Sequence, residues 1–276
     1  MAGIVLILGS APGALVARDW PRAPFEAVVA INNAWRIRDD WDVSIHPDDF
    51  PAARHPVPGP RQRRVTAAAY VPVQNRFGGF VYAGGTMALT AGYWALGALR
   101  PRVLAWFGCD MVYPAEGKTH FYGTGTADPL RADVTLRSLE AKSARLALLA
   151  AREGTHCVNL SDAPSRLVFA RARRDALPSL ARAPLPPEPP GVAEALAAEA
   201  ALGYRVPSGR YWEEAARFDP TEIDRVDALW RGAMDQGFSR YPVRNQCQQS
   251  PSTATAAALQ TARPSQGELS DTPMKP

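Results

Sequence analysis

The chain has 276 residues, 46% of them hydrophobic, which is enough to bury the core of one sizeable α/β domain with a smaller appendage. The formal net charge is +4 and the arginines are scattered, so the composition does not indicate nucleic-acid binding. Three cysteines without Cys-x-x-Cys spacing indicate neither a disulfide scaffold nor a zinc site. The sequence contains no secretory signal and no membrane span, so we expect a cytoplasmic protein, with peripheral membrane contact left open.

The first element is the apolar run of residues 4–8, which is typical of a buried parallel strand. It leads directly into Gly9-Ser10-Ala11-Pro12-Gly13. The two glycines permit a tight turn, Pro12 suits the first turn of a helix, and Ser10 is a candidate cap. A strand, a small-residue turn and a helix N-terminus together favour phosphate binding, with a plain strand–helix turn as the alternative.

Alternating strands and helices follow, and this alternation predicts a doubly wound, mostly parallel, Rossmann-like α/β sheet. Residues 54–64 read as a Pro- and Arg-rich loop. Further strands are expected at residues 28–31, 42–45, 70–73, 102–107 and 156–160, and helices at 86–96 and from the cap Asp128 and Pro129 to the stop at Gly154.

The composition changes after residue 176. We expect a nucleotide-sugar-binding domain at residues 1–176 and a Pro-rich linker with helices at 177–243. The two helices of this extension are expected at 192–202 and 221–234. Residues 244–276 are rich in Gln, Ser, Thr and Pro and are expected to be a disordered tail.

Polar residues cluster where the predicted strands end, which is where parallel sheets bind ligands. Asn side chains can donate and accept hydrogen bonds to ribose hydroxyls and base edges. The alternatives are a turn or cap for the Asn pair and a bond within its own loop for His46. The expected nucleotide-binding residues are Gly9, Ser10, Ala11, Pro12, Gly13, Asn32, Asn33, His46, Gly84, Gly85 and Asp110.

The loop of residues 113–123 brings aromatic, basic and glycine residues together after a buried strand. His120 is a candidate general base, and Tyr113 and Tyr122 are candidate donors to a leaving phosphate. The alternative is that these aromatic rings only anchor the loop to the core.

The order of these motifs resembles that of bacterial sialyltransferases of glycosyltransferase family 42. It is also similar to a related family that includes motility accessory proteins and a methanopterin-pathway pyrophosphokinase. The similarity covers roughly residues 1–170, and its segments are residues 8–12, 31–33, 46–47, 84–85, 108–110 and 120–123.

The sialyltransferase resemblance implies that the first turn and the Asn-bearing strand ends hold a cytidine-monophosphate sugar. It further implies a His base, tyrosines that assist the leaving phosphate, a glycan acceptor and no metal. Thr124 stands where the family's second, catalytic His is expected, so whether His120 or another group is the base stays open.

We therefore expect a metal-independent glycosyltransferase that uses a nucleotide-activated sugar, for which the resemblance implies a donor of the CMP-sialic type, with no further cofactor. One alternative is a magnesium-dependent pyrophosphokinase that would use Asp48, Asp49 and Asp110. The other is a nucleotide- or glycan-binding module without catalytic activity, which the Thr at 124 favours. The donor base, the sugar, the acceptor and the oligomeric state stay open.

Overall fold

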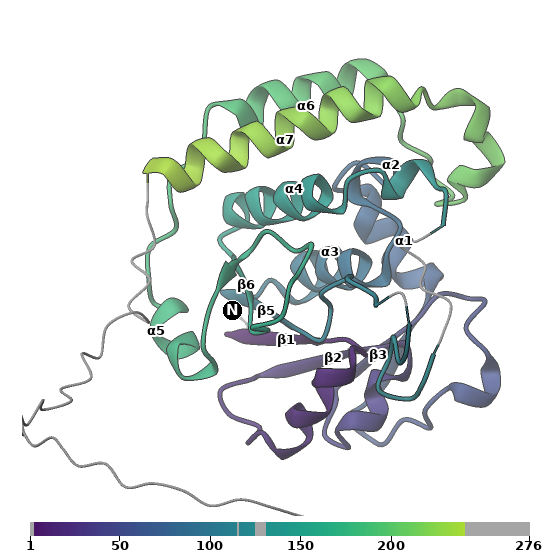
Figure 1. Ribbon diagram of the computed structural model, residues 1–276, viewed down its shortest axis with the longest axis vertical. Coiled ribbons are helices and arrows are strands. Elements are labelled where there is room, and N and C mark those ends of the chain that lie inside the picture. Colours follow the sequence, from purple (N-terminus) through teal and green to yellow (C-terminus); the bar gives the residue numbers. More distant parts are fainter. Residues whose placement is uncertain (1–2, 115, 125–130, 241–276) are drawn as a thin grey trace, which may run out of the picture. The chain divides into compact units, whose positions relative to one another are not determined.

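The centre of the fold is a parallel β-sheet with helices on both faces (Figure 1). The structure is a computed structural model that describes residues 3–114, 116–124 and 131–240, with side chains up to residue 237. The strands are β1 (Ile4–Leu8), β2 (Ala27–Ile31), β3 (Val43–Ile45), β4 (Arg63–Val65), β5 (Val103–Phe107), β6 (His156–Asn159) and β7 (Ala170–Arg171).

Longer helices and several short 3₁₀ helices join these strands. The α-helices are α1 (Ala67–Asn75), α2 (Phe80–Ala83), α3 (Met87–Leu99), α4 (Leu139–Arg152), α5 (Leu177–Leu180), α6 (Gly191–Leu202) and α7 (Pro220–Arg240). The 3₁₀ helices are η1 (Pro12–Asp19), η2 (Asn32–Ile37), η3 (Ala52–Arg54), η5 (Val134–Leu136), η6 (Arg174–Ala176) and η7 (Tyr211–Arg217).

The strand order of the described sheet is β4-β3-β2-β1-β5-β6-β7, and all of its pairings are parallel. The chain builds outward from β1 to β4 on one side and then returns to build β5 to β7 on the other. The order therefore reverses between β1 and β5, which confirms the doubly wound, Rossmann-like α/β fold.

The central strands are buried on both faces, and alternate residues serve different cores. Val5 and Ile7 of β1 pack with residues of α3 and α4. Leu6 and Leu8 pack instead with residues of η1, η2 and α5. Because both faces are covered, β1 reads as a continuous apolar run, as the sequence predicted.

The C-terminal helices form a further layer over α4 (Figure 1). A buried ion pair ties this layer to the sheet domain, because Arg145 of α4 donates to both carboxylate oxygens of Glu199 in α6 at 2.6 and 2.8 Å. Trp230 of α7 donates its indole N–H to the same carboxylate at 2.7 Å. The helical extension thus shares a polar network with the sheet domain.

One predicted strand is wrong. Residues 70–73 lie within helix α1, although Tyr70, Val71 and Val73 favour strands and Pro72 disfavours helix interiors. Three alanines precede them, and Asp48 accepts the amide hydrogen bond of Ala67 at 3.2 Å. This distant partner at the helix start stabilises a helix that the local pattern does not predict.

Three further boundaries differ from the expectation. Residues 63–65 of the expected loop form edge strand β4, and the short strand β7 was not predicted. Helix α4 begins later than expected, because the Ser138 hydroxyl accepts from the amide of Ala141 and caps it. The expected cap Asp128 with Pro129, and the expected disordered tail, lie outside the described residues.

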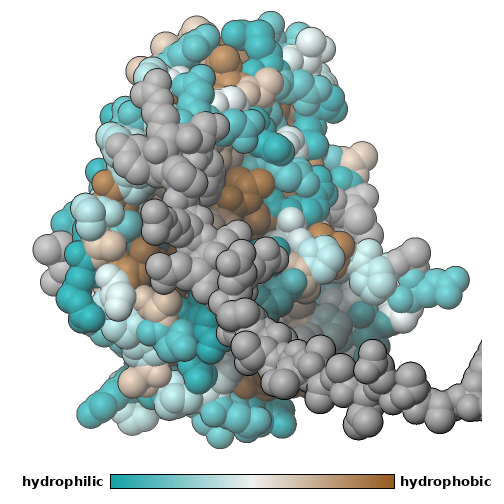
Figure 2. Space-filling view, turned by 60° about the vertical axis from the view of Figure 1, so that its left-hand side comes forward, coloured by the Kyte–Doolittle hydropathy of each residue, from teal (hydrophilic) through white to brown (hydrophobic). Residues whose placement is uncertain are grey.

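The described surface mixes polar and apolar groups. Figure 2 shows small groups of hydrophobic residues among hydrophilic ones on one face. Among the described helices, none is both long enough and apolar enough to cross a bilayer.

The Arg145–Glu199 pair gives a stability prediction. Glu199→Ala leaves Arg145 buried without its counter-charge, so we expect the free energy of unfolding to fall by about 3–5 kcal/mol in chemical denaturation. Glu194→Ala on the same helix removes an exposed carboxylate and should cost less than about 1 kcal/mol. Equal losses for the two variants would contradict the role of the buried network.

Candidate functional site

The carboxyl edge of the sheet brings the predicted strand-end residues into one row. Leu8 pairs with Ala30, and Ile31 pairs with Ile45. Ser10 and Asn32 therefore follow β1 and β2 at the same level, and His46 comes next on β3. Because the strands are parallel and adjacent, all three residues lie at one edge of the sheet, as the sequence predicted.

The first turn is fixed by close contact between β1 and β5. The Gly9 amide donates to the carbonyl of Phe107 at 2.8 Å, and the Ala11 amide donates to that of Gly108 at 3.0 Å. A Cβ on Gly9 would lie 2.2 Å from the Gly108 oxygen and 2.6 Å from the Cys109 sulfur. Packing against β5 thus requires the glycine, whether or not a ligand approaches it.

The helix after this turn is the 3₁₀ helix η1, with Pro12 at its start as expected. The expectation that Ser10 caps it is wrong, because Ala11 occupies the cap position and no side chain caps the helix. The amide of Ala11 still donates to the carbonyl of Gly108 after β5, and the helical turns begin at the next residue. A Cβ on Gly13 would meet nothing within 4 Å among the described residues, so this position is open.

The loop that carries His120 returns to the first turn. The amide of Phe121 donates to the carbonyl of Ser10 at 3.0 Å. His120 and Gly123 exchange two backbone hydrogen bonds of 3.0 Å, which closes a tight turn around Phe121 and Tyr122. The structure thus places two segments that are more than a hundred residues apart against each other.

His120 is half-buried between aromatic rings. The Tyr122 ring stacks on it with centroids 5.0 Å apart, and the Tyr113 ring lies at 5.9 Å. Its Nδ1 is 2.9 Å from the Thr119 hydroxyl. Burial lowers the pKa of His120, so the imidazole is neutral at pH 7 and able to accept a proton.

Several polar atoms are buried without a partner next to Ser10. Asn33 and His46 are each 2% exposed. The amide oxygens of Asn32 and Asn33, the Ser44 hydroxyl and Nε2 of His46 bond to no described residue. Buried polar groups are normally hydrogen-bonded, so these atoms call for a partner that the described residues do not supply.

The tautomer of His46 follows from its contacts. Its Nδ1 lies 3.0 Å from the carbonyl of Pro47, which can only accept, so Nδ1 carries the proton. Burial lowers the pKa of His46, the Pro47 bond opposes this, and the nearby guanidinium of Arg64 adds to the lowering. The imidazole is therefore neutral, and its buried Nε2 is an acceptor.

Asp110 lies beyond β5, next to a residue that the sequence did not single out. Asn159, at the end of β6, donates to the Asp110 carboxylate at 3.1 Å and accepts from the amide of Ser161 at 2.9 Å. Asn159 is the last residue of β6, one residue before the end of the predicted strand, and so lies at a strand end like the predicted site residues. The same strand-end rule could have identified it.

Gly84 and Gly85 precede helix α3, as expected, and Thr86 caps it by accepting from the amide of Leu89. A Cβ on Gly85 would lie 2.5 Å from the Thr135 hydroxyl and 3.1 Å from that of Tyr211. The second glycine therefore packs against the segment before α4 and the helical extension. No contact between this pair and the first turn is seen among the described residues.

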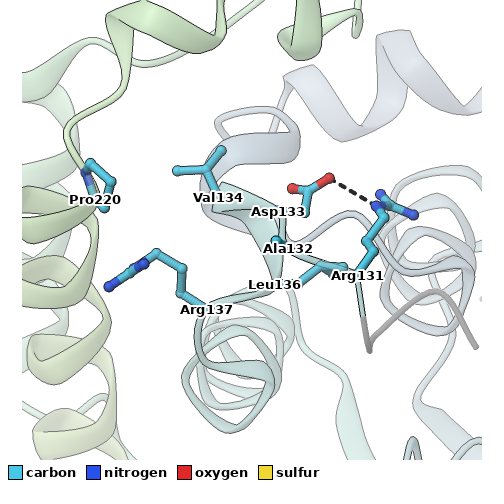
Figure 3. Close-up of a pocket in the computed structure, with 7 residues that line it drawn as sticks. All are labelled: Arg131, Ala132, Asp133, Val134, Leu136, Arg137 and Pro220. Carbon is cyan, nitrogen blue, oxygen red and sulfur yellow. Dashed lines mark hydrogen bonds and ion pairs between the residues drawn. The ribbon is translucent and has the colours of Figure 1, made fainter.

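Figure 3 shows a pocket beside that segment, lined by Arg131, Ala132, Asp133, Val134, Leu136, Arg137 and Pro220. Its volume is about 360 Å³. Arg131 and Tyr211 both bond to the Asp133 carboxylate, at 3.0 and 2.7 Å. Burial alone would raise the pKa of Asp133, but these bonds and those from Thr135 hold it below its usual value. None of the predicted site residues lines this pocket.

The carboxylates named for the magnesium-dependent alternative follow strands that are not neighbours in the sheet. Asp48 follows β3 and Asp110 follows β5, so three strand spacings, about 14 Å, separate their strands. Asp48 also holds the start of α1. In the part of the chain that the structure describes, no group of three or more His, Cys, Asp and Glu residues could hold a metal ion.

Comparison of the chain with protein-family models, with curated proteins and with solved structures found no match. The fold itself defines the class: a Rossmann-like, parallel α/β protein.

The two glycines of the first turn give a direct test of this packing. Gly9→Ala should lower the free energy of unfolding by about 1–3 kcal/mol, because its methyl group overlaps the β5 backbone. Gly13→Ala meets open space and should change stability by less than about 0.5 kcal/mol. Denaturant unfolding of both variants measures this difference, and the reverse order would refute the close contact.

Proposed function

We propose that this protein is a metal-independent glycosyltransferase that moves a sugar from a nucleotide-activated donor to an acceptor hydroxyl. The observation that carries the proposal is the hydrogen bond from the Phe121 amide to the Ser10 carbonyl. It sets a neutral, half-buried histidine beside the first turn, at the sheet edge where the unpartnered buried acceptors follow β2 and β3. The proton acceptor, the turn that would bind the phosphate and the groups that would bind the nucleobase thus lie at one edge of the sheet.

The unpartnered buried acceptors that follow β2 and β3 favour a nucleobase that carries an amino group. The unpartnered atoms of Asn32, Asn33 and His46 are all acceptors, and each needs a donor when buried. The amino group of cytosine supplies such a donor at the position where uracil has a carbonyl. This agrees with the CMP-sialic-type donor that the sequence resemblance implies.

The phosphate would lie at the start of η1. Helix N-termini attract anions. Pro12 has no N–H, and the amides of Ala11 and Ala14 donate to the carbonyls of Gly108 and Ala11, which leaves the amide of Gly13 for the phosphate. Gly13 is open to an approaching group, whereas Gly9 is enclosed by β5. The donor phosphate would then face the loop that carries Tyr113 and Tyr122.

In the proposed reaction the acceptor oxygen attacks the anomeric carbon of the sugar while the bond from that carbon to the nucleotide phosphate breaks. His120 takes the proton of the acceptor hydroxyl, and a tyrosine hydroxyl donates a hydrogen bond to the leaving phosphate. Thr124 has a structural role here, because its hydroxyl donates to the carbonyl of Gly117 at 2.9 Å. A protein that only binds nucleotides would have the same buried acceptors but would not transfer the sugar.

A nucleotide screen tests the proposed phosphate and base sites. Cytidine monophosphate should raise the melting temperature of the protein more than uridine monophosphate, since ligands stabilise the state that they bind. Gly13→Asp places a carboxylate beside the phosphate and should abolish the shift, whereas Gly13→Ala should keep it. Shifts that are equal for both nucleotides and unaffected by Gly13→Asp would contradict these sites.

A second test concerns the role of His120 as the general base. His120→Ala should lower the transfer rate by about 10²–10⁴-fold while cytidine-nucleotide binding persists. The rate of the unaltered protein should be constant near neutral pH and fall as the pH drops through a pKa below 6.5, because protonated His120 cannot accept a proton. His156→Gln changes another half-buried histidine, at the start of β6, and should leave transfer unchanged. Nucleotide binding without transfer by the unaltered protein would favour the binding-module alternative.

A further inference from the structure

A second pocket lies at the other ends of the two 3₁₀ helices that begin at the carboxyl edge. Helices η1 and η2 start beside Ser10 and at Asn32, and each runs back along the sheet before the next strand begins. Their last turns and the following residues enclose a pocket of about 480 Å³. It is lined by Arg18, Trp20, Arg22, Arg36, Ile37, Arg38, Asp39 and Asp40.

Two of its four arginines are held by the protein itself. Arg38 is 6% exposed, donates to both oxygens of Asp40 at 2.8 and 2.7 Å, and donates to the carbonyl of Ala17 at 2.8 Å. Arg22 donates to the carboxylate of Asp42 at 2.6 Å. These bonds join η1, η2 and the start of β3, so they set the walls of the pocket in advance.

The other two arginines are exposed, and their side chains do not join segments of the protein. Arg18 and Arg36 stand in the last turns of η1 and η2. Neither makes a hydrogen bond or an ion pair with any residue in the described ranges, and Arg36 lies 5.4 Å above the ring of Trp35. The termini of two adjacent helices thus each present an uncompensated guanidinium to one pocket.

The charge balance of the pocket is positive. Its lining has four arginines against two aspartates, which leaves a net charge of +2. Outside the lining, Asp42 offsets one charge, but Arg174 adds another where it lies 5.0 Å above the ring of Trp20. One guanidinium nitrogen of Arg174 is buried without a described partner. With Asp42 and Arg174 included, the net charge is still +2.

We infer that this pocket binds a small polyanion, with Arg18 and Arg36 as its ligands and the Arg22–Asp42 and Arg38–Asp40 pairs as its frame. Guanidinium groups bind phosphate and carboxylate oxygens through paired, charge-assisted hydrogen bonds. The pocket lies at the opposite edge of the sheet from the proposed nucleotide site. Its ligand is therefore a second molecule, and the inference stands without the proposed transfer reaction.

Calorimetric titration of the full chain with inorganic pyrophosphate, and separately with citrate, tests the inference at low ionic strength, where charge pairing is least screened. We expect saturable binding of at least one of them. Binding of pyrophosphate alone identifies a phosphate-bearing ligand, and binding of citrate alone a carboxylate-bearing one. R18Q/R36Q should weaken the binding at least about tenfold.

Two controls separate this pocket from other sites. R210Q/R225Q removes the same number of exposed charges from the helical extension and should leave the affinity unchanged. Gly13→Asp disables the proposed phosphate site at η1 and should also leave it unchanged. The inference fails if neither anion binds saturably, if R18Q/R36Q binds as well as the unaltered chain, or if Gly13→Asp removes the binding.

Discussion

The close contact between β1 and β5 is the constraint on which the rest of the site depends. The strand order reverses between β1 and β5, and the segments that follow these two strands leave the sheet in different directions. A Cβ on Gly9 would lie 2.2 Å from the Gly108 oxygen and one on Gly108 would lie 2.6 Å from the Ala14 Cβ, so neither position accommodates a larger side chain without movement. The carbonyl of Ser10 is thereby held where the Phe121 amide can reach it. A small shift between β1 and β5 would separate the first turn from the His120 loop.

The helical extension supports the same domain from the other side. Arg145 and Lys142 of α4 are both buried and both paired with carboxylates from the extension, Glu199 and Asp227. Buried pairs of this kind are costly to break because they leave one charge unpaired. Tyr211 of the extension also bonds to Asp133, next to the glycines that precede α3. The extension therefore fixes helices that lie over the sheet.

Sequence patterns predicted the parts of the fold whose causes are local. The central strands are apolar on both faces, and helix α3 carries its own cap in Thr86, so each was recognisable from its residues alone. Helix α1 was not, because its start depends on Asp48 in a different loop. Strand β4 exposes two arginines and is a strand only because β3 pairs with it. Such partners are invisible to a local pattern.

The candidate site likewise has parts that the local sequence predicts and parts that depend on tertiary packing. The strand-end rule selected Ser10, Asn32 and His46, and the strand register aligns them at one edge. Gly84 and Gly85 were grouped with them from sequence, yet their nearest neighbours lie in α3, in α4 and the segment before it, and in the helical extension. The role of Ser10 as a cap depended on a helix starting one residue earlier than it does. Composition and spacing therefore predict the sheet edge at which these residues lie, while their contacts depend on tertiary packing.

Hydrogen exchange of the backbone amides, with and without saturating cytidine monophosphate, tests the central claim most directly. A nucleotide held at the carboxyl edge should slow exchange at Gly13, at Asn32 and Asn33, and in the His120 loop, since these segments would contact it or lose their fluctuations on binding. Protection confined to the pocket of Arg131 and Arg137, or to the arginine pocket at the opposite edge, would contradict the account.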